Sequence, residues 1–266
     1  MEENTRPVTF REDHVEAGGF RIKYQEAGQG NPVVILEGMT WGILKLHHAL
    51  AHKYRVVVLE LPGFGASPAN TRSSSVRDLA GTVAQATAKI VTDKFTLIGT
   101  SFAANVALWH ALLAPQPVEA LVLISPTSLL PLGNPAAGSP LERAQRLLAH
   151  PENWAGLPLV EPGIVAREQE LVRRLGGDLH DAEAESRLGE IQCSTLVVFG
   201  SQDRLVDGAA ASIYRRDIPN SHLSIVYDAG HLVAAERPEA LINTVVDYVE
   251  RRETFVVSRR SRVINP

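Results

Sequence analysis

Short runs of apolar residues recur along this chain and alternate with stretches of helical periodicity. The runs cover Val33–Leu36, Arg55–Leu59, Phe95–Gly99, Leu121–Ile124, Thr195–Phe199 and Leu223–Tyr227. Strands that are apolar on both sides are typical of a parallel sheet with helices on both faces. Two earlier segments, Val8–Ala17 and Phe20–Glu26, meet at Gly18-Gly19 and predict an antiparallel hairpin. The sequence therefore predicts an α/β fold with a mostly parallel sheet that begins with antiparallel strands.

The alternation stops between about Thr127 and Gly189. This segment is rich in proline and glycine, lacks any strand-like run, and contains three amphipathic stretches, Leu141–Ala149, Gly163–Leu175 and Asp181–Leu188. We therefore expect a helical cap at residues 127–189, inserted into a core domain formed by residues 1–126 and 190–266. Long insertions in α/β folds tend to lie at the carboxyl ends of the strands, where ligands bind. An insertion without a role in substrate selection is the alternative.

Net charge, cysteine content and the length of the apolar runs limit which partners and which cellular compartment we expect for this protein. The chain has 266 residues and a formal net charge of -4, so it has no general electrostatic reason to bind nucleic acid or an anionic membrane. One cysteine, Cys193, excludes an internal disulfide. The first residues are charged and do not resemble a signal peptide, and no apolar run approaches the ~20 residues that span a bilayer. We expect a cytoplasmic protein that contacts neither nucleic acid nor membrane.

Ser101 directly follows an apolar strand and precedes a helical pattern at Phe102–Leu113. The residues two before and two after it, Gly99 and Ala103, are both small. A serine on a sharp strand-to-helix turn has a strained backbone and an exposed hydroxyl, and such a turn requires small neighbours. The N–H of Phe102 would lie at a helix N-terminus, where backbone donors are free. A serine that merely caps the helix is the alternative.

Two further residues could activate that serine. A serine hydroxyl is a poor nucleophile and needs a base, and His231 is the best candidate among nine histidines because it lies on a loop after the strand Leu223–Tyr227. Asp203 follows the strand Thr195–Phe199 and could orient the histidine, although aspartate is also a common helix N-cap. Three suitable groups, each just after a strand, are a much stronger signal than any one alone.

These residues belong to a larger set of sequence blocks that resembles the α/β-hydrolase family nearly end to end. The blocks are Leu36-Glu-Gly-Met-Thr-Trp41, Glu60-Leu-Pro-Gly-Phe-Gly-Ala-Ser67, Gly99-Thr-Ser-Phe-Ala103, Gly200-Ser-Gln-Asp203, and Gly230-His231 followed by Glu236-Arg-Pro238. The resemblance implies an eight-stranded, mostly parallel sheet with helices on both faces and a cap inserted after the sixth strand. It implies a catalytic triad of Ser101, Asp203 and His231. It also implies an oxyanion hole made by the backbone N–H groups of Met39 and Phe102.

The chain departs from the family pattern near the predicted oxyanion hole. The family usually has His-Gly in that loop, where this sequence has Glu37-Gly38. A carboxylate beside a developing oxyanion opposes catalysis unless it points away, pairs with a cation or is protonated. The other departures are conservative: Ala103 replaces a glycine, and Glu60 replaces an aspartate.

The resemblance and the serine nucleophile favour acyl transfer to water. Relatives that open epoxides or displace halide use an aspartate in place of the serine, and the predicted cap contains no tyrosine to act as an acid. Gly38, Trp41 and Trp154 are candidate residues of an apolar substrate pocket. We therefore expect hydrolysis of a small or medium hydrophobic carboxylic ester. Cleavage of a carbon–carbon bond in a vinylogous diketone acid is the alternative, and it should require an arginine in the pocket.

An alternative outside the enzymes is a non-catalytic protein that binds a small molecule. Glu37 supports this alternative, because a carboxylate beside the predicted oxyanion hole opposes catalysis. We expect no cofactor and no metal, because the sequence contains neither a nucleotide-binding motif nor a paired Cys/His cluster. The tail after Glu250 contains five arginines and a short apolar patch. It fits a partly ordered terminus, and an arm packed on a second subunit of a homodimer is the alternative.

Overall fold

The computed structural model describes residues 8–38, 40–132, 139–176 and 180–255. Its eight strands form one sheet in the order β1-β2-β4-β3-β5-β6-β7-β8. The strands are β1 (Arg11–Ala17), β2 (Phe20–Ala27), β3 (Pro32–Leu36), β4 (Arg55–Leu59), β5 (Phe95–Thr100), β6 (Val118–Ile124), β7 (Ser194–Gly200) and β8 (Ser221–Val226). The predicted apolar runs are thus confirmed as the strands of a single sheet.

The pairing of the strands also follows the prediction. β2 pairs antiparallel with both β1 and β4, and every other neighbouring pair is parallel. The turn between β1 and β2 is formed by Gly18 and Gly19, which have φ angles of 57° and 77°. Glycine adopts this left-handed region without the steric cost that a side chain would add, and two such residues form the turn that suits a two-residue hairpin.

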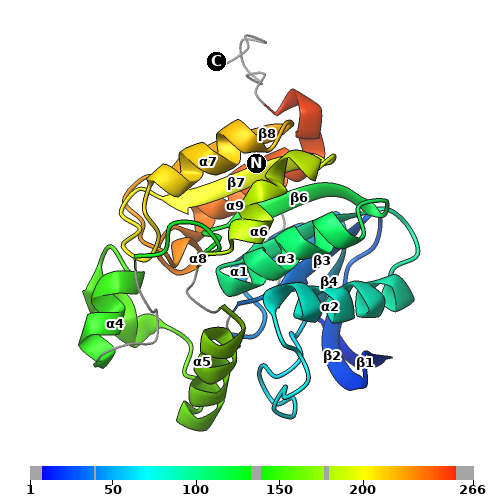
Figure 1. Ribbon diagram of the computed structural model, residues 1–266, viewed down its shortest axis with the longest axis horizontal. Coiled ribbons are helices and arrows are strands. Elements are labelled where there is room, and N and C mark those ends of the chain that lie inside the picture. The colour runs from blue at the N-terminus through cyan, green and yellow to red at the C-terminus, as the bar shows by residue number, and fades with distance from the viewer. Residues whose placement is uncertain (1–7, 39, 133–138, 177–179, 256–266) are drawn as a thin grey trace.

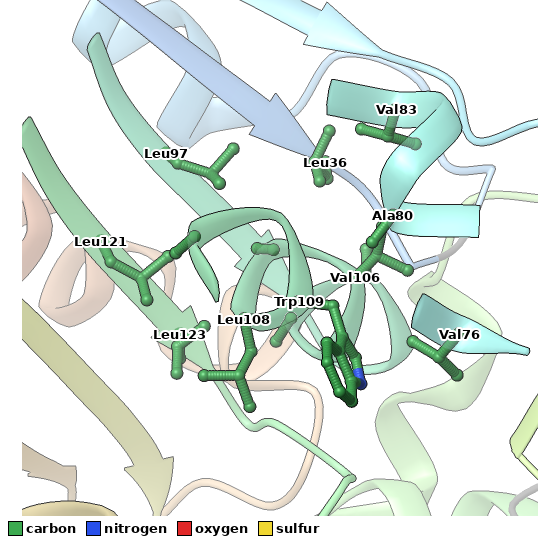
Figure 2. Packing of buried hydrophobic residues seen from close by; sticks show 14 of the residues in the cluster. Leu36, Val76, Ala80, Val83, Leu97, Val106, Leu108, Trp109, Leu121 and Leu123 are labelled. Carbon is green, nitrogen blue, oxygen red and sulfur yellow. The ribbon is translucent and has the colours of Figure 1, made fainter. Parts of the chain in front are cut away.

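Helices cover both faces of the sheet because successive strand residues point to opposite sides. On β3, Val34 and Leu36 join one apolar cluster, while Val33 and Ile35 join another. The first cluster packs against α2 (Val76–Ile90), α3 (Phe102–Leu113) and α7 (Ala209–Asp217). The second packs against α1 (Lys45–Ala51), α8 (Val233–Glu236) and α9 (Pro238–Arg251) (Figure 1). Figure 2 shows the first cluster, where Trp109 of α3 and Val76 of α2 lie close together.

The segment between β6 and β7 contains helices and, among its described residues, only one isolated β-bridge, from Pro131 to Val206. The helices are α4 (Pro140–Leu147), η1 (Pro151–Gly156), α5 (Pro162–Gly176), α6 (Ala182–Ser186) and η2 (Leu188–Glu190). Figure 1 shows α4 and α5 beyond one end of the sheet, whereas α6 lies nearer to it. The position in the chain matches the predicted insertion, while its role as a substrate-selecting cap stays a prediction.

None of the helices in the described residues combines the length and the apolar character that crossing a membrane would need. Most of the arginine-rich tail, at residues 256–266, lies outside the described part of the chain. Both expectations for this tail, a partly ordered terminus and the alternative of an arm packed on a second subunit, therefore stay predictions.

Candidate active site

Ser101 lies on the sharp turn that the sequence predicts. β5 ends at Thr100 and α3 begins at Phe102, so Ser101 alone joins strand to helix, with φ 55° and ψ -123°. This is a strained conformation for a residue with a side chain, and such strain persists only where the surroundings enforce it. A Cβ atom at Gly99 would lie 2.5 Å from the carbonyl oxygen of Ala103 and 2.7 Å from the Cα of Ala104. The turn therefore requires glycine at position 99, because the neighbouring backbone leaves no space for a side chain.

The structure brings Ser101, His231 and Asp203 together in one hydrogen-bonded chain. The Oγ atom of Ser101 lies 2.8 Å from Nε2 of His231, and Nδ1 of His231 lies 2.9 Å from Oδ2 of Asp203. The residues come from loops that follow β5, β8 and β7, and the carboxyl ends of parallel strands meet at one edge of a sheet. The predicted convergence of the three side chains is present, and their catalytic role stays a prediction.

Asp203 is held so that one carboxylate oxygen faces the histidine. Its Oδ1 accepts hydrogen bonds from the backbone N–H groups of Leu205, at 2.8 Å, and Val206, at 3.1 Å. The side chain is only 5% exposed, and that of His231 is fully buried. Because Oδ1 is occupied by backbone donors, Oδ2 is the oxygen left for His231, and a carboxylate there favours the proton on Nδ1. Nε2 is then free to accept the proton of Ser101.

The loop that carries His231 is fixed by a carboxylate whose role the sequence did not predict. Glu236 accepts hydrogen bonds from the backbone N–H of Gly230 at 2.7 Å, Ala149 at 3.0 Å and His150 at 2.9 Å. Glu236 belongs to the Glu236-Arg-Pro238 block, which was therefore the available signal, although the block does not say what the carboxylate contacts. Because Ala149 and His150 belong to the inserted segment, Glu236 joins that segment to the residue next to His231.

The predicted oxyanion hole can be checked at one of its two donors. Phe102 begins α3, so its backbone N–H is one of the free donors of a helix N-terminus. Gly38 packs against this turn: a Cβ atom there would lie 2.3 Å from the carbonyl oxygen of Thr100 and 3.2 Å from the nitrogen of Phe102. Met39, the other predicted donor, lies outside the described residues. The loop after β3 is thus closely packed on the turn that bears Ser101.

Glu37, the unusual residue of that loop, has a partner. Its Oε1 lies 2.8 Å from Nε2 of His47, which is fully buried. The Nδ1 atom of His47 accepts the backbone N–H of Leu44 at 3.0 Å, so the ring hydrogen of a neutral imidazole is on Nε2, which donates to Glu37. The Glu37 side chain is therefore held against α1 by a hydrogen bond.

A cavity of about 310 Å³ opens at Ser101 and runs along α3. Phe102, Asn105 and Trp109 line it and lie on one face of α3, because their spacing of three and four residues matches the helical repeat. Val172 and Leu175 of α5 also line it. The span from Ser101 to Trp109 corresponds to about 12 Å at the rise of an α-helix. The cavity therefore extends from the Ser101 turn along the first two turns of α3.

The three residues predicted to form the pocket do not line the cavity along α3. Gly38, Trp41 and Trp154 are not among the residues that line this cavity. Trp41 and Trp154 pack instead against a small apolar cluster formed by Leu147, Leu148, Leu205 and Leu232. That cluster lies next to the site, because Leu232 follows His231 in the chain. Their assignment to a substrate pocket stays a prediction.

The charged groups that line the cavity have partners within the protein. Arg77 lies 2.6 Å from Glu183 and over the ring of Trp109 at 5.4 Å from its centroid. Asp181 accepts the indole N–H of Trp109 at 2.6 Å. The amide of Asn105 makes both of its contacts with Thr127: its nitrogen lies 2.8 Å from the Thr127 hydroxyl, and its oxygen accepts the Thr127 N–H at 2.9 Å. Sequence reasoning missed this polar end of the cavity.

No group of three or more His, Cys, Asp and Glu side chains is placed to hold a metal ion among the residues that the structure describes. The sequence also matches a known protein family. Residues 33–244 match the model of the alpha/beta hydrolase family. Because the match covers most of the chain, this protein belongs to the alpha/beta hydrolase family.

Two curated proteins and one solved structure are similar to this chain. The chain is 27% identical over 281 residues to a 2-hydroxy-6-oxononadienedioate/2-hydroxy-6-oxononatrienedioate hydrolase of Escherichia coli K12, covering 93% of this chain and 98% of that protein. It is 28% identical to the dihydrolipoyllysine-residue acetyltransferase component of an acetoin cleaving system from Pseudomonas putida, covering 89% of this chain and 68% of that one. A serine hydrolase from Cycloclasticus zankles superposes with a TM-score of 0.75 at 16% identity, covering 91% of this chain and 98% of that one, and shares its fold.

Proposed function

We propose that this protein is a serine hydrolase that cleaves a small or medium hydrophobic carboxylic ester through an acyl-enzyme. The observation that carries the proposal is the chain of contacts from Ser101 through His231 to Asp203, at 2.8 and 2.9 Å, located where the cavity along α3 begins. A nucleophile, a base within hydrogen-bond reach and a group that orients the base are the parts that acyl transfer requires.

The reaction proceeds in two halves. Ser101 Oγ attacks the ester carbonyl carbon while its proton moves to His231 Nε2, and the Phe102 N–H, together with that of Met39, stabilises the oxyanion. The carbon–oxygen bond to the alcohol breaks, and the alcohol leaves with the proton from His231. A water molecule then loses a proton to the same nitrogen and attacks the acyl-enzyme. Collapse releases the carboxylic acid and returns the proton to Ser101.

The cavity favours an uncharged substrate. A diketone acid carries carboxylates, and a buried carboxylate needs a cation or several donors. Arg77, which lines the cavity, is paired with Glu183, and Asp181 and Glu183 add negative charge at the same end. A neutral acyl chain would meet Phe102, Val172 and Leu175 without such a cost. We propose that the inserted segment acts as a cap here, because Val172 and Leu175 of α5 form one wall of the cavity.

A second candidate is carbon–carbon bond hydrolysis, which the Escherichia coli relative named above favours. The two candidates separate in a direct comparison of p-nitrophenyl acetate, butyrate, octanoate and palmitate with 2-hydroxy-6-oxononadienedioate. We expect butyrate and octanoate to react fastest and palmitate poorly, because about 310 Å³ is at the small end of ligand pockets. Faster turnover of the dienedioate than of every ester would overturn the ester proposal.

The Ser101→Ala variant should lose all ester hydrolysis above background, while Ser74→Ala, which changes an exposed serine, should keep it. A wild-type protein that binds esters without turning them over would instead favour the non-catalytic binding protein.

A further inference from the structure

Glu168 lies in the inserted segment but is almost completely enclosed by the rest of the protein. It is on α5 and only 7% exposed, whereas the side chain of Glu170, two residues further on, is 59% exposed and pairs with Arg173. Burying a carboxyl group is unfavourable unless it forms hydrogen bonds, so its partners identify what the burial achieves. Burial raises the pKa of Glu168, and hydrogen bonds from Thr40 and Gly65 act in the opposite direction.

One oxygen of Glu168 joins two loops of the core domain. Oε1 accepts the hydroxyl of Thr40, which lies in the loop after β3, and the backbone N–H of Gly65 at 2.9 Å, in the loop after β4. The neighbouring Arg167 donates to the carbonyl oxygen of Gly65 at 2.8 Å. The N–H and the C=O of Gly65 are therefore both bound by successive residues of α5, and the same helix turn is bound to Thr40.

Thr40 belongs to the loop that packs on the Ser101 turn. It follows Met39, the second predicted oxyanion donor, and is two residues after Gly38, which has no room for a Cβ atom beside Thr100 and Phe102. An oxyanion donor is effective only if it lies within hydrogen-bond distance of the developing charge, so a small displacement of this loop is costly. A fixed partner for Thr40 is a means of preventing such a displacement.

We propose that Glu168 is a positioning residue. It holds the loop after β3, which contains the predicted oxyanion donor Met39, in place through Thr40, and so makes the inserted segment part of the reacting site. This inference rests on the proposed serine hydrolase function. Glu168 itself touches neither the substrate nor the reacting atoms. Because the oxyanion forms only in the transition state, losing this contact lowers kcat and leaves KM nearly unchanged.

The experiment compares four variants with p-nitrophenyl butyrate as the substrate. Glu168→Ala removes the acceptor, and Thr40→Val removes the hydroxyl donor at nearly constant volume. We expect each to lower kcat about 10-fold to 100-fold, which is less than the loss of a whole donor. Glu168→Gln keeps an amide oxygen that can accept from Thr40 and Gly65, and it should restore kcat to within about threefold of wild type. Glu170→Ala is the matched control on the same helix and should change nothing.

Coupling between the two residues gives a sharper test. If Glu168 acts through Thr40, the double variant Glu168→Ala/Thr40→Val should be little slower than Glu168→Ala alone, because the second change removes a contact already lost. Wild-type kcat in Glu168→Ala, or a rise in KM alone, would overturn the inference while leaving the proposed function intact. If Glu168→Ala does not fold, Thr40→Val decides: an unchanged kcat there contradicts the inference.

A readout that does not depend on activity separates the two proposals. Amide hydrogen exchange in the peptides that span residues 37–44 and 61–67 should be faster in Glu168→Ala than in wild type or Glu170→Ala. Unchanged exchange would contradict the positioning role. An inactive wild type whose exchange still responds to Glu168→Ala would mean instead that the serine hydrolase function has failed while the structural link is real.

Discussion

The sheet and the inserted segment are held in place in different ways. Leu97 and Val198, in the sheet, are fully buried among apolar neighbours, and burial of this kind is the main source of folding stability. The insertion contributes Leu171 and Leu175 to the large apolar cluster and shares a small one with the core. It also meets the loops around Ser101 through polar contacts, because Glu168 accepts from Gly65 and the backbone of residues 149 and 150 donates to Glu236. We therefore expect the sheet to supply most of the folding stability and the loops at its carboxyl edge to supply the reacting groups, while the polar contacts of the insertion hold those loops in place. Changes in the two regions should therefore affect different measurements.

The largest effect is expected in the core, at Asp203. Asp203→Asn keeps an oxygen for the N–H groups of Leu205 and Val206 but presents an amide to His231, which favours the wrong tautomer of the imidazole. We expect kcat to fall about 10³-fold to 10⁴-fold with little change in melting temperature. The control is Asp207→Asn, an exposed residue four positions further on, which should retain full activity. A near-normal kcat in the Asp203→Asn variant would show that this aspartate does not orient His231 for the reaction.

The second prediction contrasts one leucine from each region. Leu97→Ala leaves a cavity under α3 and should lower the free energy of unfolding by about 2–5 kcal/mol. Leu141→Ala, on α4, changes a residue that is 63% exposed and should stay within about 0.5 kcal/mol of wild type. Urea unfolding monitored by circular dichroism measures both. Comparable losses in the two variants would mean that stability is not concentrated in the sheet.

Acid should destabilise the core through His110. This residue is buried in α3, and burial lowers its pKa to about 4. The unfolded chain takes up the proton near pH 6.5, well above the folded chain, so stability is lost as the pH falls from about 6.5 to 4. The loss amounts to about 3 kcal/mol. His110→Leu should flatten this part of the stability curve, whereas His52→Leu, at an exposed position, should leave it unchanged. An equally steep decline in His110→Leu would assign the acid sensitivity elsewhere.

The smallest expected effect on stability comes from the contact between the insertion and the His231 loop. Glu236→Ala leaves three backbone N–H groups without their acceptor and should cost about 1–3 kcal/mol. Ester hydrolysis should also slow, because Gly230 precedes His231. Glu239→Ala, which breaks only an exposed pair with Lys45, should change neither property. Full activity in a folded Glu236→Ala would show that His231 is held without the insertion.

The same contrast explains what the sequence could predict. The strands could be predicted because a strand covered on both faces is apolar throughout. The Ser101 turn could be predicted because it requires small residues on either side. Asp203 and His231 could be found because residues after parallel strands share one edge of the sheet. In each case a short sequence pattern determines where a residue lies in the fold, and these cases all fall in the core domain.

The contacts of the insertion follow no such local rule. The helical repeat places Glu168 on the same face as Val165 and Leu171, and Glu170 on another face, but it does not identify Thr40 and Gly65 as the partners of the buried carboxylate. The pairing of Glu37 with His47 depends on how the loop after β3 meets α1. The prediction that Trp41 and Trp154 form the pocket rests on their apolar rings, and such rings pack equally well beside a site. The cavity that opens at Ser101 is lined instead by α3 and α5.

The central claim is that His231 activates Ser101 as a nucleophile, and covalent labelling with a fluorophosphonate probe tests it most directly. Wild type should take up one probe per chain at pH 7.5, and mass spectrometry of the digested protein should locate it on the peptide that contains Ser101. His231→Ala should react at least about 100-fold more slowly, because the serine loses its base. A wild type that stays unlabelled, or labelling that persists in Ser101→Ala, would contradict the account.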